Sequence, residues 1–471
     1  MHRIYPTLAA SLFASTIIAC DAGALPAEPS TTESPHAIES TSPAPLPEGP
    51  FGGDSIVFGS LAKIVDGRHT FRFDTFGDED FWGGQLQMHR GIAGAANGGV
   101  GAGVSPRLAL QLGLKVDAEA LPAAVVRGIQ DQSISLDDPA TTVALLKLNA
   151  VVGVTGFFDG GGKLRSLGIQ CALCHSTVDD SFAPGIGRRL DGWANRDLNV
   201  GAIVAATAQN VQPLIDLFKN ANVTLSAADI AGILNSWGPG KFDAEVFLDG
   251  KSTGPRGSAA TLIPPAFNLD GVNQHTWTGW GSITYWNAFV ANLEMHGKGN
   301  FTDARLADAS KFPIAAAPGN HLYQVTNPVD RISPKLPALE FYQLAIAAPK
   351  PPRGSFDVRA AARGKTAFTT YHCASCHTPG ITSDAGWNMH TPAELAIDAF
   401  QANRGPDGRY RTAPLNGLWT HTKGGFYHDG RFATLDAVLD HYASHGVGNH
   451  GQPFTYAGTD KADLAQYLMS L

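Results

Sequence analysis

The arrangement of apolar and polar positions predicts helices in four segments of the chain: 141–152, 224–236, 358–371 and 459–471. In the last of these, Leu464, Leu468 and Leu471 follow the spacing of one helical face, and Asp460 is placed to cap the helix. Segment 51–100 is rich in aromatic residues and glycine and has little periodicity, so we expect loops and short helices there. Alternating strand patterns are sparse. The expected fold class is therefore mainly α, with long loops.

The N-terminus has the pattern of an export signal. Arg3 precedes an apolar run from Leu8 to Ala19, which is too short to span a bilayer as a helix. The run ends at Cys20 in a sequence that resembles the lipobox of bacterial lipoproteins, in which the cysteine receives lipid after cleavage. We predict a signal peptide over 1–19 and lipid attachment at Cys20. Ordinary cleavage nearby, with Cys20 idle or lost, is the alternative.

Composition separates a tether from a globular body. Residues 21–50 hold seven prolines and seven serines or threonines, so a disordered tether is expected over 20–50. The whole chain has 471 residues, of which 44% are hydrophobic, enough for a sizeable core. Its net charge of −8 argues against nucleic-acid binding. No segment after the signal is apolar enough to cross a bilayer, which leaves the lipid anchor as the expected membrane contact.

Four of the five cysteines form two C-x-x-C-H motifs, at Cys171-Ala172-Leu173-Cys174-His175 and Cys373-Ala374-Ser375-Cys376-His377. This motif is the attachment signature of c-type haem: two thiols bond the haem vinyl groups, and the histidine becomes the proximal iron ligand. The motifs therefore predict two covalently bound haem c groups. A zinc site shared by both cysteine pairs and a thioredoxin-like redox pair are the competing interpretations.

Proline-rich residues 349–352 mark the expected boundary between the two haem domains. We expect a helical or irregular region over 51–160, a first c-haem domain over 161–348 and a second over 355–471. In the second domain, a first and a last helix crossing at a small residue is the cytochrome c design. Gly364 is the expected point of close approach.

Residues 411–442 resemble the C-terminal haem domain of bacterial di-haem cytochrome c peroxidases and their relatives, including the methylamine-utilisation di-haem enzyme. The run Tyr427-His428-Asp429-Gly430, followed by Thr434-Leu435, is the most specific part. The resemblance implies that the haem at Cys373, Cys376 and His377 takes electrons and that the haem at Cys171, Cys174 and His175 meets peroxide. The resemblance also makes calcium a candidate cofactor, because a calcium ion lies between the domains in some relatives.

The sixth iron ligands are open in the sequence. Where the peroxidases carry a methionine in the helix after residue 434, this chain has Tyr442, as the methylamine-utilisation type does; a core aromatic is the alternative. Between His175 and His275 the chain has no histidine and no methionine. Met295 and His296 are therefore the candidates for the first haem, and an open site is the alternative.

Other side chains are candidates for supporting roles around the haems. Trp193, Trp280 and Trp286 are candidates for a bridge between the haems, against the alternative of ordinary core residues. Three basic residues are candidates for pairing with haem propionates, against a solvated surface role: Arg188, Arg189 and Lys298.

Together these features predict an exported di-haem c-type cytochrome that passes electrons from the C-terminal to the N-terminal haem, with reduction of hydrogen peroxide as the leading activity. A non-catalytic, membrane-tethered electron carrier and a di-haem oxygenase or protein-modifying enzyme are the alternatives. Small soluble redox proteins or quinol-chain donors are the expected partners. The expected location is the periplasmic side of a bacterial cell envelope, with the chain held through Cys20.

Overall fold

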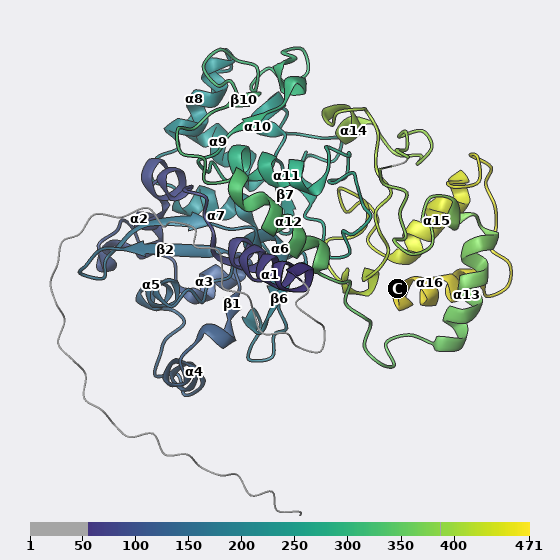
Figure 1. The fold of residues 1–471 in the computed structure, drawn as a ribbon, viewed down its shortest axis with the longest axis horizontal. Helices are drawn as coiled ribbons and strands as arrows, with labels where there is room; N and C mark the ends of the chain where they lie inside the picture. Colours follow the sequence, from purple (N-terminus) through teal and green to yellow (C-terminus); the bar gives the residue numbers. More distant parts are fainter. Residues whose placement is uncertain (1–54, 387) are drawn as a thin grey trace, which may run out of the picture. The chain divides into compact units, whose positions relative to one another are not determined.

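The structure, a computed structural model, describes residues 55–386 and 388–471. The predicted signal peptide (1–19), the tether (20–50) and Cys20 lie outside the described residues. Residues 55–471 form one compact unit in which helices dominate and strands are short (Figure 1). The expected helical character is confirmed at this level. Among the described helices, none has both the length and the apolarity needed to cross a bilayer.

The α-helices, in chain order, are α1 (Ser55–Phe73), α2 (Met88–Ala93), α3 (Pro106–Gln111), α4 (Ala123–Gln130), α5 (Pro139–Lys147), α6 (Ala172–His175), α7 (Val200–Thr207), α8 (Gln212–Asn220), α9 (Ala227–Asn235), α10 (Val246–Asp249), α11 (Ile283–Phe289), α12 (Leu336–Ala345), α13 (Val358–Thr370), α14 (Phe400–Arg404), α15 (Leu435–His445) and α16 (Asp460–Ser470). Short π or 3₁₀ turns that matter for the site are η4 (Val290–Glu294) and η7 (Cys373–Ser375).

The strands pair in twos. They are β1 (Val116–Asp117), β2 (Val154–Phe158), β3 (Leu164–Ile169), β4 (Ser176–Val178), β5 (Ile186–Gly187), β6 (Arg189–Asp191), β7 (Lys241–Phe242), β8 (Thr261–Leu262), β9 (Phe301–Thr302) and β10 (Gln324–Val325). β1 and β5 are parallel, whereas β2–β3, β4–β6, β7–β8 and β9–β10 are antiparallel. The hairpin β2–β3 leads directly into α6 and the first haem motif.

Helix α1 corrects the expectation of loops and short helices over 51–100, because it runs for 19 residues. It crosses α12 at Gly67, where a Cβ atom would lie 2.6 Å from the Cβ of Tyr342. Next to this crossing, the rings of Phe71 and Tyr342 meet edge to face at 5.6 Å. The helix is thus held by a partner far away in the sequence, which no local pattern reports.

The four predicted helices are present as α5, α9, α13 and α16. Helix α5 ends at Lys147 rather than at residue 152, because Asn149 takes a left-handed φ of 52°. Asp460 does not cap α16 as expected: it lies in the first turn, after Thr459 at the N-cap position. Helix α9 starts with a capping box between Ser226 and Asp229.

Helices α13 and α16 cross at Gly364, as expected, and lie next to α15 in Figure 1. A Cβ atom at residue 364 would lie 2.5 Å from the carbonyl carbon of Asp463 and 2.8 Å from the Cβ of Tyr467. Only glycine permits this approach without a shift of the helices. Phe368 and Leu468, one on each helix, belong to the same buried apolar cluster.

A buried ion-pair group ties α14 to the segment around α10. Arg404 donates to Asp249 at 2.7 Å and to Asp243 at 2.8 Å, and all three side chains are almost fully buried. Arg404 is about 155 residues from Asp249 along the chain, so the pair joins distant segments. The predicted domain boundary near residues 349–352 stays a prediction.

Candidate functional site

Each C-x-x-C-H motif lines its own cavity. The C-terminal cavity, of about 230 Å³, contains Cys373, Cys376 and His377 in its wall. The N-terminal cavity, of about 210 Å³, contains Cys171, Cys174 and His175. The motif residues lie on one turn in each case, α6 for the first and η7 for the second. The structure therefore places a predicted pair of thiols and a predicted proximal histidine together at each of two cavities.

The two motif histidines are held in the same way. Nδ1 of His175 lies 3.1 Å from the carbonyl oxygen of Pro264, and Nδ1 of His377 lies 3.0 Å from that of Thr382. A carbonyl only accepts hydrogen bonds, so the ring proton must be on Nδ1 and the lone pair on Nε2. Burial lowers the pKa of His175 to about 4, which keeps this imidazole neutral. Metal-binding histidines usually donate one ring N–H to an acceptor in this way, which fixes the ring orientation and leaves the other nitrogen free to bind the metal.

Burial keeps three of the four motif thiols neutral. All four are free, and burial raises the pKa of Cys171, Cys174 and Cys373 to about 12. A thioredoxin-like pair needs a thiol with a lowered pKa, so this interpretation does not fit the first pair. The two pairs line different cavities and do not converge on one point, which also removes a zinc site built from both.

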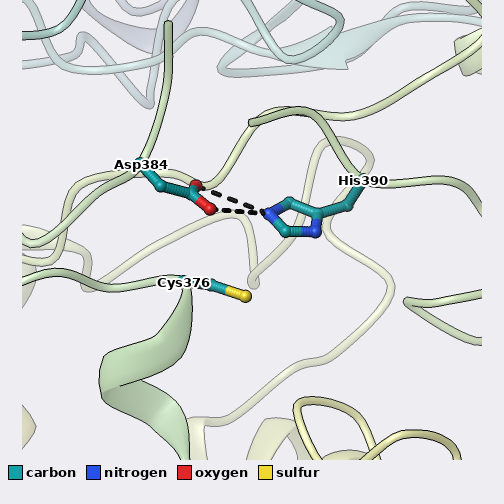
Figure 2. A group of neighbouring side chains, drawn as sticks. All are labelled: Cys376, Asp384 and His390. Carbon is teal, nitrogen blue, oxygen red and sulfur yellow. Dashed lines mark hydrogen bonds and ion pairs between the residues drawn. The ribbon is translucent and has the colours of Figure 1, made fainter. Parts of the chain in front are cut away.

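Cys376 lies near an ion pair between Asp384 and His390 (Figure 2). Nε2 of His390 is 3.1 Å from Oδ2 of Asp384, and this hydrogen bond raises the pKa of His390 to about 10. The ligand atoms of the three residues lie within 4.8 Å of one another, the only such group of three or more His, Cys, Asp or Glu among the described residues. Calcium prefers several oxygen ligands, and this group has one carboxylate, so calcium stays a prediction.

The sixth-ligand candidates line the expected cavities. Tyr442, on α15, is in the wall of the C-terminal cavity with His377, and burial raises the pKa of its hydroxyl to about 12. Met295 and His296, which follow η4, are both in the wall of the N-terminal cavity with His175. His296 stacks on the ring of Phe81 at 3.6 Å. Whether any of the three reaches an iron stays a prediction.

The predicted propionate partners lie elsewhere. Arg188 pairs with Asp179 and Arg189 pairs with Asp117, while Lys298 forms an ion pair with Asp80; none of the three basic residues lines either haem cavity. The arginines that do line the cavities are Arg196, in the C-terminal cavity, and Arg411, in both.

Neither of these two arginines has an acidic partner among the described residues. Nη1 of Arg196 and Nε of Arg411 are buried without a hydrogen-bond acceptor. Burial lowers the pKa of each guanidinium to about 10, so both remain cationic at neutral pH. Unpaired buried cations fit a site that receives carboxylates from a bound group, and haem carries two propionates. The residues present therefore fit a haem in each cavity.

The tryptophan between the cavities is one that sequence reasoning missed. Trp277 lines both cavities, and its Nε1 donates to the carbonyl oxygen of Leu262 at 2.7 Å. Of the predicted candidates, Trp193 lines only the C-terminal cavity and Trp286 only the N-terminal one. Trp280 is a core residue that packs against Phe289 at 5.5 Å. Trp277 lies close in sequence to Trp280 and Trp286, and nothing local distinguished it from them.

The N-terminal cavity also holds a buried carboxyl group. Glu294 ends η4 and lines the cavity with Cys174 and His175, and its Oε1 is buried with no hydrogen-bond partner among the described residues. Burial, with a smaller contribution from the carboxyls of Glu245 and Asp243, raises the pKa of Glu294 well above its usual value. Such a group can hold a proton inside an apolar cavity.

Comparisons with known proteins add little to this geometry. Neither a protein-family model nor a curated protein sequence matches the chain. Among solved structures, a chain of hydrazine synthase from Kuenenia stuttgartiensis, studied under 20 bar of xenon, is similar at 17% identity. The match covers 47% of this chain and 76% of that chain, with a TM-score of 0.26.

Proposed function

We propose that the chain is a di-haem c-type cytochrome, with one haem bound through Cys171, Cys174 and His175 and the other through Cys373, Cys376 and His377. One observation carries the proposal: the same arrangement is built twice, in unrelated surroundings. In each, a C-x-x-C-H turn lines a cavity, and a backbone carbonyl fixes the histidine through Nδ1. Chance does not explain two such sites in one chain.

A haem in either cavity supplies one-electron redox chemistry and, where its iron has an open position, a binding site for peroxide. The chain supplies the route between the two sites. Trp277 lies in the wall of both cavities, which supports passage of electrons from the C-terminal to the N-terminal site. The indole is held by its hydrogen bond to Leu262, so its orientation between the sites is fixed.

Reduction of hydrogen peroxide is the activity that this arrangement supports best. The reaction takes one peroxide, two electrons and two protons to two waters, so protons must reach a buried site. The carboxyl group of Glu294 is placed in the wall of the N-terminal cavity, with Oε1 free to donate or accept. Its position supports a role as the group that holds and transfers a proton there.

A second function is favoured by Met295 and His296, which line the same cavity. If either residue binds the iron permanently, peroxide has no access, and the protein is an electron carrier without turnover. Tyr442 lines the C-terminal cavity, and it is the residue that supports a third proposal, an oxygenase or protein-modifying enzyme. In each case we propose attachment to the cell envelope through Cys20 and exchange of electrons with small redox proteins or quinol-chain donors.

The test is to express the full chain in a host that matures c-type cytochromes and to weigh the product. We expect the mass of two haem groups, with one lost in C171A/C174A and the other lost in C373A/C376A. The matched control is C20A, which removes the proposed lipid attachment site and is expected to retain both haems. A full-length protein without covalent haem would overturn the proposal.

Peroxide turnover separates the first function from the second. EPR spectra of the half-reduced protein, recorded with and without peroxide, report whether the N-terminal iron has an open position. We expect a peroxide-dependent signal change and turnover that falls in Glu294→Gln while both haems remain attached. If both irons stay six-coordinate and no peroxide is reduced, peroxide reduction would be refuted and the electron-carrier function would stand.

A further inference from the structure

Arg411 stands out among the buried charges of the molecule. Its side chain is only 8% exposed and lines both the N-terminal and the C-terminal cavity. Among the described residues, Nε has no acceptor, and the only side-chain hydrogen bond of Arg411 is a long one of 3.4 Å from Nη1 to the carbonyl oxygen of Gln274. The backbone nitrogen donates to the carbonyl oxygen of Trp277 at 3.0 Å, which fixes the residue between the cavities.

Two other buried arginines among the described residues, Arg404 and Arg189, are paired with acids. Arg404 has Asp243 and Asp249 within 2.8 Å, and Arg189 has Asp117 at 3.1 Å. Burying a cation without a counter-charge costs several kcal/mol, on the order of what breaking a buried pair costs. The contrast indicates that Arg411 is built to meet anions that are not part of the polypeptide, and its position admits anions from two sides.

We propose that Arg411 is a shared anchor that binds a propionate carboxylate of each haem, so that one guanidinium serves both cofactors. This rests on the proposed di-haem function and goes beyond it. A guanidinium has five N–H donors arranged in a planar fork, so it can serve two carboxylates at once, which a lysine cannot do equally well. Arg196, which lines only the C-terminal cavity, is proposed to serve one haem alone.

The shared charge has a redox consequence. A nearby cation favours the reduced iron, whose net charge is lower by one, and therefore raises the reduction potential. If Arg411 serves both haems, its removal must lower both potentials. If Arg196 serves one, its removal must lower that of the C-terminal haem alone.

The experiment is a spectroelectrochemical titration of the full-length protein with both haems attached, comparing wild type, R411Q and the matched control R196Q. Single-haem variants C171A/C174A and C373A/C376A assign each potential to its haem. In R411Q we expect the equilibrium constant for reduction to fall about tenfold at each haem, which is 59 mV for a one-electron couple. In R196Q we expect this change at the C-terminal haem only.

A second variant keeps the test decisive if R411Q does not fold. In R411K the charge is retained but titrates, so both potentials should fall together as the pH rises through the lysine pKa, whereas those of the wild type should not. A change at one haem or at neither, in a protein that retains both haems, would overturn the shared anchor and leave the di-haem proposal intact. Absence of covalent haem would instead overturn the di-haem proposal itself.

Discussion

Replacing Gly364 with alanine should destabilise the C-terminal part of the protein. The new Cβ would lie 2.5 Å from the carbonyl carbon of Asp463, on the backbone of α16. Carbon atoms pack at about 3.5–4.0 Å, so the two helices must separate by about 1 Å. Overpacking of this kind costs about 1–3 kcal/mol, and contact with backbone rather than with a flexible side chain places it near 3. Alanine regains about 1 kcal/mol of helix propensity. The expected net loss is about 2 kcal/mol.

The same substitution at Gly232 is the matched control. Gly232 lies within α9, is exposed, and has no atom within 4 Å of where its Cβ would be. There alanine should stabilise the protein by about 1 kcal/mol, so the two variants should differ by about 3 kcal/mol. Urea unfolding, followed by circular dichroism, gives both values.

The effect of Gly364→Ala should also reach the C-terminal cavity. Phe368 on α13 and Leu468 on α16 line that cavity, so separating the helices moves two of its walls. We expect the absorbance of the C-terminal haem to change at a lower urea concentration than that of the N-terminal haem in the variant, because its covalent bonds hold the haem while its cavity opens. A Gly364→Ala variant as stable as Gly232→Ala would refute the close crossing of α13 and α16 at residue 364.

Three further substitutions test other parts of the structure. Tyr442→Phe should change the EPR spectrum of the C-terminal haem in a C171A/C174A background; an unchanged spectrum would make Tyr442 a core residue. Trp277→Phe should slow electron equilibration between the haems in stopped-flow measurements while haem content stays the same, and an unchanged rate would exclude Trp277 from the route. Burial raises the pKa of Asp243 from 3.8 to about 7. Between these pH values the folded state holds a proton that the unfolded state releases. The free energy of unfolding therefore falls as the pH rises from about 4 to about 7. Asp243→Asn should reduce this fall by more than about 1 kcal/mol in urea titrations at pH 4 and pH 7, and equal falls in both proteins would contradict the assignment.

Helices whose signals are local could be predicted from the sequence. Helix α16 carries its apolar stripe within its own residues. Gly364 could be identified as the point of helix crossing because it is a small residue within the helix that precedes the second C-x-x-C-H motif. Helix α1 could not be found this way, since its buried face is defined by α12, more than 260 residues later in the chain. The early end of α5 follows from the left-handed conformation of Asn149, which a pattern of apolar residues does not reveal.

The two cavities likewise combine residues that the local sequence identifies with residues that only the fold brings together. The cysteines and proximal histidines are contiguous, so the motif alone identified them, and the structure places each set at a cavity. The cavity walls are assembled from distant segments: the N-terminal cavity takes Trp82 from one end of the described chain and Arg411 from the other. Arg188 and Arg189 were candidates for pairing with propionates, but Arg188 pairs with the nearby Asp179 and Arg189 with Asp117, which lies 72 residues earlier in the chain.

The segment from Leu262 to Pro265 explains how two haem sites can be held in a fixed relation. The carbonyl of Leu262 accepts the hydrogen bond of Trp277, and the carbonyl of Pro264 accepts that of His175, while Pro265 itself lines both cavities. The two consecutive prolines fix their φ angles, so this segment has little freedom to move one of these contacts without the other.

A shuttle that carries electrons one at a time does not require such a shared wall, because its two sites can work independently. Peroxide reduction consumes two electrons at one site, and it benefits when the second site can supply its electron through a fixed route. Pro265, the indole of Trp277 and the guanidinium of Arg411 all line both cavities. Their convergence supports the proposal of a catalytic di-haem protein over that of a carrier, and under this proposal electron transfer between the haems should be the property most sensitive to changes in this wall.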